Sequence, residues 1–378
     1  MARRNFRKKR KNDKFFAYIT LVIVIISILL ITYLLVKYSK PQVKKRKIIK
    51  KVVEKNKKAD ENIYFARTFV EDFLFLSNIN FSEFSRKGYT EFRIKIKDKD
   101  YRIIKSKFEI YTKRRDFILK IKKISDKKYD WLLFKKESLK IEIIVNIAKT
   151  KIVKTDKKSK VSIIIDDIGN NRYSIDELSK LNYKIAFSIL PNSPFRNYGR
   201  DMGKKHKKQI MLHLPLEPIK SNGYKLNLNG FLLVSMRDEI IKNYTEEYIS
   251  MVPEAKGVNN HTGSLFTTRV DKMKTVLSII KRKKLFFIDS KTTAKTIGYK
   301  LAKRMRIKTG IRDIFLDGDN EKITILNFKH LFSIAREKGY AIGIGHPKPE
   351  TIKVMRERVE KLARKYNIEL VYPSKIVK

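Results

Sequence analysis

Two adjacent carboxylates, Asp166 and Asp167, are the first candidates for chemistry in this chain. They follow the apolar run Val161–Ile165, which is typical of a short strand buried on both faces of a parallel sheet. Such sheets carry their reactive side chains at the carboxyl ends of the strands. Two neighbouring carboxylates are costly to keep ionised there unless a metal or another cation neutralises them. An isolated pair is more often one helix cap and one solvated acid, so the choice depends on the residues at the ends of the other strands.

Polar side chains accompany five more apolar runs. They are His213 and Glu217 after 210–212, Asn259, Asn260 and His261 after 257–258, Asp289 and Ser290 after 285–288, Arg312, Asp313 and Asp317 around 314–316, and His346 after 341–344. The carboxyl ends of parallel strands meet at one edge, so these clusters should converge. Three of the five histidines stand in them, which is difficult to explain as packing. The pattern predicts an active-site mouth.

The residue types in these clusters favour a metal. Asp, His and Glu are ligands of zinc and other divalent transition metals. A metal that activates water beside a free carboxylate base provides the parts of a metal-assisted hydrolase. His206, in a basic helix end, and His330, inside a helical pattern, are expected to have structural roles. Asp317, Gly318 and Asp319 are interpreted as a turn, because the series of calcium ligands is incomplete.

The elements that must position these residues alternate between apolar strands and amphipathic helices. Strands are predicted at 161–165, 185–190, 210–212, 257–258, 285–288, 314–316 and 341–344. Helices are predicted at 175–181, 238–251, 270–283, 294–305, 328–338 and 350–366. This alternation predicts βαβ units, and their number favours an α/β barrel over an open sheet for residues 155–378.

The amino-terminal part has a different composition. Residues 1–14 form a basic arm, and residues 15–36 are all apolar or uncharged. The second run is long enough to cross a hydrocarbon core of about 30 Å and lacks a cleavage site, which predicts an uncleaved transmembrane helix. Residues 37–58 are a basic linker. With the short arm kept in the cytoplasm, we expect a single-pass membrane protein whose carboxyl-terminal domain lies outside the cytoplasm.

Residues 59–154 are predicted to form a small α+β domain. The pattern at 60–76 indicates an amphipathic helix. From Glu91 to Ile147 apolar residues alternate with charged ones, as in a half-buried antiparallel sheet. Trp131 and the other aromatic residues are interpreted as core. No catalytic constellation occurs in this stretch, so the sequence assigns it no role.

The charge of the chain suggests a polyanionic neighbour without identifying one. The 378 residues include 88 basic and 39 acidic ones, which gives a formal charge of +49 spread along the whole length. Nucleic acid, anionic lipid and an acidic wall polymer would all attract such a charge. The lack of a nucleic-acid-binding motif weighs against specific recognition of nucleic acid. There are no cysteines, which excludes disulfides and thiolate sites.

At the strand-end clusters the chain resembles the NodB-like carbohydrate esterase superfamily, and within it the divergent polysaccharide deacetylase family of the YibQ type. The segments that carry the resemblance are IIIDDIG, FSILP, LHLPLEP, GVNNHTGS, FFIDS, RDIFLD and GIGHP, in this order between residues 160 and 374. The resemblance implies a deformed (β/α) barrel and a metal-dependent hydrolase that acts on carbohydrate amides. It does not cover the first 155 residues.

The resemblance also implies catalytic roles. Asp166 corresponds to the general base, His346 to the general acid, and Asp289 to the carboxylate that orients a neighbouring catalytic group. Four further polar residues of the mouth, Asn259, Asn260, Ser290 and Arg312, are assigned to substrate binding.

The implied metal site departs from the usual pattern of the superfamily. Asp167 corresponds to a metal ligand, and His213 matches the first of two metal-binding histidines. Glu217 stands where the second histidine is expected, and His261 is the candidate to replace it. The predicted cofactor is a divalent metal, with zinc as the first choice.

These observations support three functions. The leading hypothesis is a membrane-anchored, metal-dependent hydrolase that deacylates an amide or ester of a cell-envelope glycan. The alternative is a non-catalytic relative that binds glycan in the same cleft. A membrane-tethered binder of a polyanion is the third hypothesis, and it depends only on the charge.

Overall fold

The computed structural model describes residues 63–86, 88–135, 137–149, 157–219 and 227–378, together with Leu30 and Tyr33. The chain divides into two compact units, Met1–Ala66 and Arg67–Lys378. The predicted transmembrane segment, residues 15–36, lies outside the described residues apart from those two positions. Among the residues that are described, no helix combines the length and the apolar character needed to cross a bilayer.

The first of two sheets described in Arg67–Lys378 has five strands in the order β1-β2-β5-β4-β3. The strands are β1 (Phe81–Arg86), β2 (Tyr89–Lys97), β3 (Ile118–Ser125), β4 (Lys128–Lys135) and β5 (Ser138–Ala148). Residues 63–76 form one helix, and Asp98–Lys113 form a second, α2. Trp131 is 1% exposed and stacks on Phe108, as expected of a core residue.

This sheet differs from the antiparallel one that the alternation predicted. The central strands β2 and β5 run parallel, and the other neighbours run antiparallel. The difference comes from α2, which the alternation of charges did not reveal. Because α2 follows β2 and precedes the β3-β4-β5 meander, the chain can return to pair with β2 in the same direction.

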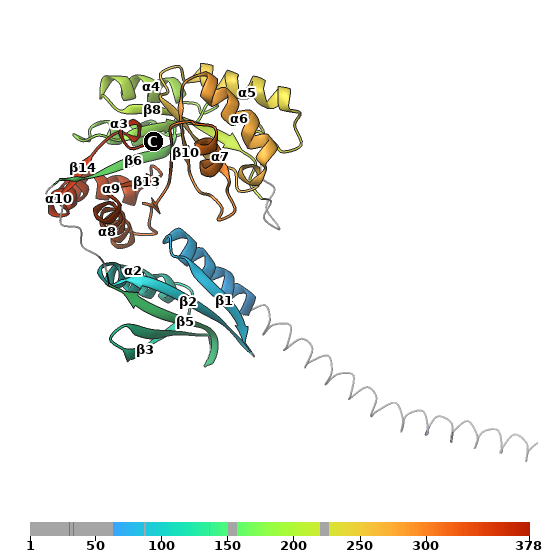
Figure 1. Ribbon diagram of the computed structural model, residues 1–378, viewed down its shortest axis with the longest axis vertical. Helices are drawn as coiled ribbons and strands as arrows, with labels where there is room; N and C mark the ends of the chain where they lie inside the picture. The colour runs from blue at the N-terminus through green and yellow to red at the C-terminus, as the bar shows by residue number, and fades with distance from the viewer. Residues whose placement is uncertain are drawn as a thin grey trace, which may run out of the picture. The chain divides into compact units, whose positions relative to one another are not determined.

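The second sheet is built from parallel pairs in the order β11-β10-β9-β8-β7-β6-β13-β12, with β14 also pairing with β6 (Figure 1). Its strands are β6 (Ser159–Ile168), β7 (Ala186–Ile189), β8 (Gln209–Leu216), β9 (Gly257–Thr262), β10 (Phe286–Asp289), β11 (Thr309–Ile311), β12 (Ile314–Phe315), β13 (Tyr340–Gly345) and β14 (Ile368–Leu370). The helices between them are α3 (Arg172–Ser179), α4 (Arg196–Lys205), α5 (Asp238–Met251), α6 (Val270–Arg282), α7 (Gly298–Arg304), α8 (Glu321–Lys338), α9 (Pro349–Glu357) and α10 (Val359–Lys365). Two short 3₁₀ helices are η1 (Phe266–Thr268) and η2 (Pro373–Lys375).

One continuous segment serves both edges of this sheet. Strand β11 pairs with β10 at one edge. After only two intervening residues the chain continues as β12, which pairs with β13 at the other edge. At the change of partner, the amide of Arg312 donates to Asp289 O at 3.0 Å and the amide of Asp313 donates to Ile342 O at 2.8 Å. The sheet therefore curls round on itself, which gives the deformed (β/α) barrel that the sequence predicted.

Alternate residues of the barrel strands face two different cores. Ile163 and Ile165 of β6 belong to the core shared with the surrounding helices, whereas Ile164 packs with Met211 and Ile288 inside the barrel. Side chains along a strand alternate between its two faces. Asp166 and His213, two positions beyond Ile164 and Met211, therefore point into the carboxyl end of the barrel.

Candidate active site

Three side chains from three strands converge on one point at the carboxyl end of the barrel. Asp167 comes from β6, His213 from β8 and His261 from β9. Asp167 Oδ1 lies 3.2 Å from His213 Nε2 and 3.0 Å from His261 Nδ1, and these two nitrogens are 3.2 Å apart.

The donor set of this cluster fits a divalent metal. Asp167 Oδ1 is buried and makes no hydrogen bond of acceptable geometry with the described part of the chain, although two imidazole nitrogens face it. A buried anionic oxygen without a hydrogen bond is rare unless another partner belongs there. One carboxylate and two imidazoles, each able to supply one ligand atom, are a common set for zinc.

The charges in the cluster are set by mutual contact. Burial opposes ionisation of Asp167, but the contacts with His213 and His261 outweigh it and lower the pKa of the carboxyl. Burial also opposes protonation of His213, yet Asp166 and Asp167 raise the pKa of its imidazole. Asp167 is therefore ionised at neutral pH.

An irregularity in β6 brings two consecutive acids to the same place. The register of β6 against β7 shifts between Ile165 and Ile168, and Asp167 has a φ of 57°, in the left-handed region. A regular strand would point Asp166 and Asp167 to opposite faces. Here Asp166 Oδ2 lies 3.5 Å and Asp167 Oδ1 3.2 Å from the same atom, His213 Nε2.

Asp166 is held in place by a buried amide. The Nδ2 of Asn259 donates to Asp166 Oδ1 at 2.9 Å and to Ser290 Oγ at 3.0 Å. Ser188 in turn donates its hydroxyl proton to Asn259 Oδ1, which fixes the orientation of the amide. Burial raises the pKa of Asp166, and His213 and His346 partly offset this effect. The result is a carboxylate of increased proton affinity in a fixed orientation.

His346, just after β13, stands on the other side of Asp167. Its Nε2 lies 3.9 Å from Asp167 Oδ2, and its Nδ1 lies 2.5 Å from Asp317 Oδ2. Asp317 Oδ1 accepts hydrogen bonds of 2.9 Å from the His346 amide and from Thr351 Oγ1. Burial opposes protonation, but Asp317 outweighs it and raises the pKa of His346 to about 9. His346 is therefore an imidazolium at neutral pH.

The carboxylate beside His346 is Asp317, and Asp289 lies in a different hydrogen-bonded network. Asp289 is fully buried and accepts hydrogen bonds from the Lys291 amide, the Thr296 hydroxyl and the Tyr299 amide, so it organises the loop between β10 and α7. The sequence placed Asp317 among the polar residues at the strand ends and in a turn, but gave it no catalytic role. The signal that could have found it is its position directly after a strand, which it shares with the other residues of the mouth.

Glu217 also lies apart from the place where the sequence put it. Its Oε2 accepts a hydrogen bond of 2.7 Å from the Val234 amide, and its carbonyl oxygen accepts from the amides of Leu265 and Phe266. Among the described residues, the metal-type cluster consists of Asp167, His213 and His261 and does not include it. Glu217 ties two loops of the mouth together.

The residues assigned to substrate binding form a buried support beneath the mouth. Asn259, Asn260, Ser290 and Arg312 are each at most 2% exposed. Asn260 Oδ1 accepts from the Ser290 amide at 2.9 Å, and Arg312 donates to the carbonyl oxygens of Ser290 and Lys291 at 2.8 Å each. Their polar groups hold the strand ends together, so contact with a substrate would require them to leave these partners.

Comparison with known proteins places the barrel in a family. Residues 163–377 match the family model described as divergent polysaccharide deacetylase. A protein of Haemophilus influenzae is 31% identical over 215 residues, which are 57% of this chain and 75% of that protein. Protein YibQ of Escherichia coli is 31% identical over 207 residues, which are 54% of this chain and 63% of that protein.

A solved structure shares the fold. A protein of Agrobacterium tumefaciens C58 superposes with a TM-score of 0.54 at 23% identity, over 58% of this chain and 90% of that one. The family match runs from β6 to the carboxyl end, so it includes Asp166, the three clustered side chains and the pair formed by His346 and Asp317.

Proposed function

Because the chain belongs to the divergent polysaccharide deacetylase family, we propose that its barrel is a metal-dependent hydrolase that removes acyl groups from a cell-envelope glycan. The observation that carries the proposal is the convergence of Asp167, His213 and His261, with Asp167 Oδ1 buried and without a hydrogen bond to any described residue. Asp166 and His346 both adjoin this cluster, where a base and an acid are needed.

Asp167, His213 and His261 would hold the metal, and zinc is the first candidate for this set of ligands. When bound there, a metal of this kind polarises a carbonyl group and lowers the pKa of water. The protein contributes the ionised carboxylate of Asp167 and the two imidazole nitrogens that face it, His213 Nε2 and His261 Nδ1.

The side chains of the barrel supply the proton transfers. Asp166 is the proposed general base, because its buried carboxylate has an increased affinity for a proton and Asn259 fixes its direction. His346 is the proposed general acid, because Asp317 binds Nδ1 and leaves the Nε2 proton free to pass to the departing nitrogen or oxygen. The two groups come from the ends of the paired strands β6 and β13, so both lie beside the cluster that would hold the metal.

Acetate release from acetylated glycan fragments tests this proposal. Full-length protein loaded with zinc should release acetate from N-acetylglucosamine oligomers or acetylated wall fragments, and removal of the metal should abolish the release until metal is restored. Asp166→Asn should bind the same amount of metal while turnover falls by about 10²–10⁴-fold. Metal-loaded protein that binds glycan fragments saturably without releasing acetate would refute the hydrolase and favour the glycan-binding alternative.

We also propose that the barrel acts outside the cytoplasm, anchored by residues 15–36. The support is the apolar run itself and the short basic arm in front of it. Protease added to intact spheroplasts should digest the barrel domain. Full protection of the barrel, with digestion only after lysis, would refute this topology.

A further inference from the structure

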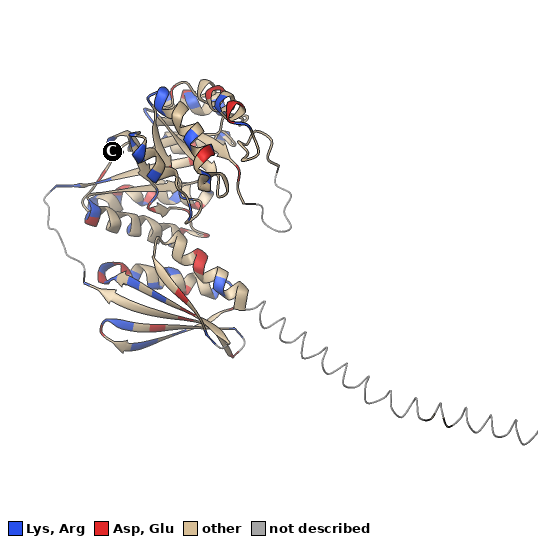
Figure 2. Ribbon diagram, turned by 45° about the vertical axis from the view of Figure 1, so that its right-hand side comes forward, with Lys and Arg blue, Asp and Glu red and all other residues tan. Residues whose placement is uncertain are grey.

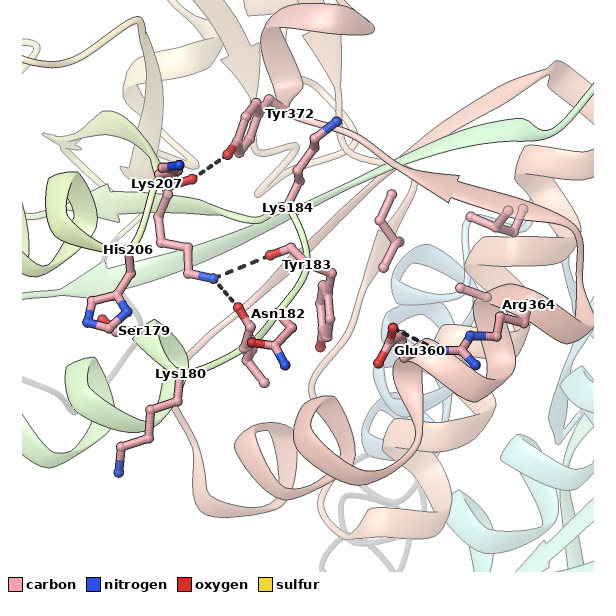
Figure 3. Close-up of a pocket in the computed structure, with 15 residues that line it drawn as sticks. Ser179, Lys180, Asn182, Tyr183, Lys184, His206, Lys207, Glu360, Arg364 and Tyr372 are labelled. Atoms are coloured by element: carbon pink, nitrogen blue, oxygen red, sulfur yellow. Dashed lines mark hydrogen bonds and ion pairs between the residues drawn. The ribbon is translucent and has the colours of Figure 1, made fainter.

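A cavity lies at the end of the barrel strands opposite the candidate active site. It has a volume of about 550 Å³, within the range of small-molecule sites. Its lining comes from 179–184 in front of β7, from 206–208 in front of β8, from α10 and from β14 (Figure 3). Asp167, His213 and His261 lie toward the carboxyl ends of their strands, so this cavity is separate from the candidate active site.

The lining of this cavity is strongly basic. Its basic side chains are Lys180, Lys184, Lys207, Lys208 and Arg364, and His206 lies beside them. The one carboxylate in the lining, Glu360, is bound by Arg364 at 3.0 Å. The charge of Lys180 is paired with a residue that does not line the cavity, because its Nζ lies 2.8 Å from Glu177.

Three of these lysines have no carboxylate partner within the described part of the chain. They are Lys184, Lys207 and Lys208. Lys208 is only 7% exposed, and its Nζ donates to the carbonyl oxygens of Leu181 and Tyr183. Burial lowers the pKa of Lys208 to about 8, so it remains charged at neutral pH although it is poorly solvated. Neutral carbonyl groups compensate a buried ammonium less well than an anion would.

The remaining walls are apolar or aromatic. Leu181, Ile368 and Leu370 contribute aliphatic surface. Tyr183 and Tyr372 add aromatic rings, and Lys184 Nζ lies 5.9 Å from the centroid of the Tyr372 ring. Tyr372 also donates its hydroxyl proton to the carbonyl oxygen of Lys207, which ties the two sides of the cavity together (Figure 3). A free inorganic ion would use the lysines and leave these walls unoccupied.

We propose that this cavity binds the phosphate ester of a small sugar or polyol. The positive charge of Lys184, Lys207 and Lys208 attracts the phosphate group, and the organic part lies against Tyr183 and Leu370. Phosphate is the suitable anion because a dianion can accept charge-assisted hydrogen bonds from several ammonium groups at once. The proposal does not depend on hydrolysis at the other end of the barrel.

Binding of glucose 6-phosphate to the full-length chain tests this site. The titrations are made by calorimetry at physiological salt on metal-stripped protein, so that the oxyanion cannot bind a metal. Glucose 6-phosphate should bind saturably at one site and more tightly than inorganic phosphate, and glucose should not bind. The double variant Lys184→Gln/Lys207→Gln, at two exposed positions, should raise the Kd at least about tenfold.

A matched control separates this site from the general charge of the chain. Lys281→Gln/Lys283→Gln removes two exposed lysines at the end of α6, which do not line the cavity. This variant should keep the wild-type Kd. An equal loss of binding in both double variants, or no saturable binding in the millimolar range, overturns the site. Equal affinity for inorganic phosphate and glucose 6-phosphate overturns the assignment of an ester.

Discussion

Replacing Asp317 by Asn should lower the pKa of the His346 imidazole from about 9 toward its ordinary value. The amide keeps the size of the carboxylate, and its oxygen can still accept from the His346 amide and from Thr351. Its NH₂ group, however, would face His346 Nδ1, where the carboxylate now accepts a hydrogen bond of 2.5 Å. A donor at that position favours the neutral imidazole over the imidazolium.

The size of the effect follows from the shift. An imidazole with a pKa of about 9 is about 90% protonated at pH 8, and one with a pKa of about 6.5 is about 3% protonated. If His346 is the general acid, the competent fraction at pH 8 therefore falls by up to about 30-fold. Asp166 and Asp167 also raise this pKa and remain in the variant, so the fall will be smaller than this limit.

The same pair affects stability, with a defined sign. The folded-state pKa of His346 lies above its unfolded value of about 6.5, so the stabilisation is complete below that pH and is lost as the pH rises through about 9. The full shift corresponds to at most about 3 kcal/mol. Metal-free wild type should lose this advantage over Asp317→Asn between those two pH values.

Nuclear magnetic resonance titration of the histidine ring in metal-free protein measures the pKa directly, and urea unfolding across the same pH range measures the stability. Thr351→Val is the control, because it removes one hydrogen bond to Asp317 and leaves the charge. An unchanged His346 pKa in Asp317→Asn would refute the pairing, and an equal fall in both variants would show that packing, not charge, sets the pKa.

Three further changes test other parts of the site. Asp167→Asn should lose both bound metal and turnover, whereas Asp166→Asn should keep the metal, as measured by metal stoichiometry; the opposite result would exchange the two roles. Glu217→Gln should keep the metal, because its carboxylate binds the Val234 amide, and loss of metal would make it a ligand after all. Asn259→Ala removes the donor to the buried Asp166 Oδ1 and should cost about 1–3 kcal/mol in urea unfolding, and an unchanged unfolding midpoint would contradict the hydrogen bond.

The basic charge supports no specific partner beyond the cavity described above. Figure 2 shows Lys and Arg on the strands of the five-stranded sheet as well as on helices of the barrel. Charge dispersed in this way attracts polyanions without defining a binding surface. The polyanion hypothesis therefore stays a prediction of the sequence.

The regular parts of the barrel could be predicted because each depends on a local signal. The helix predicted at 238–251 is α5, and all seven predicted strands occur. Strongly polar helices were harder to find. The sequence pattern did not reveal α4, and it placed the start of α8 at 328 instead of Glu321, where the side chain of Asn320 accepts from the Ile323 amide and caps the helix. The helix predicted at 350–366 is two helices that meet at Arg358.

The sequence predicted where in the fold the polar residues come together, but it predicted less well which of them contact one another. The strand ends converge as expected, because parallel strands share one edge. The carboxylate that contacts His346 is determined by which strands pair with each other, and such long-range pairing cannot be inferred from local sequence. Asp317 follows the short strand β12, which pairs with β13, the strand that precedes His346. The sequence also did not reveal that Asn259 is buried. Its side chain points into the protein because of its position in the alternation along β9, and no local pattern indicates that position.

The irregularity in β6 explains why two adjacent acids can share one site. Alternation along a regular strand would have turned one of the two carboxylates toward the helices. The shifted register and the left-handed φ of 57° at Asp167 turn its side chain back toward the barrel axis. Gly169 follows with a φ of 115°, and an ideal Cβ there would lie 1.9 Å from Ser193 Oγ, so the turn requires a glycine. The segment Asp166–Gly169 therefore acts as one unit, in which the glycine permits the turn, the turn places Asp167, and Asp166 stays in the strand as the neighbouring carboxylate.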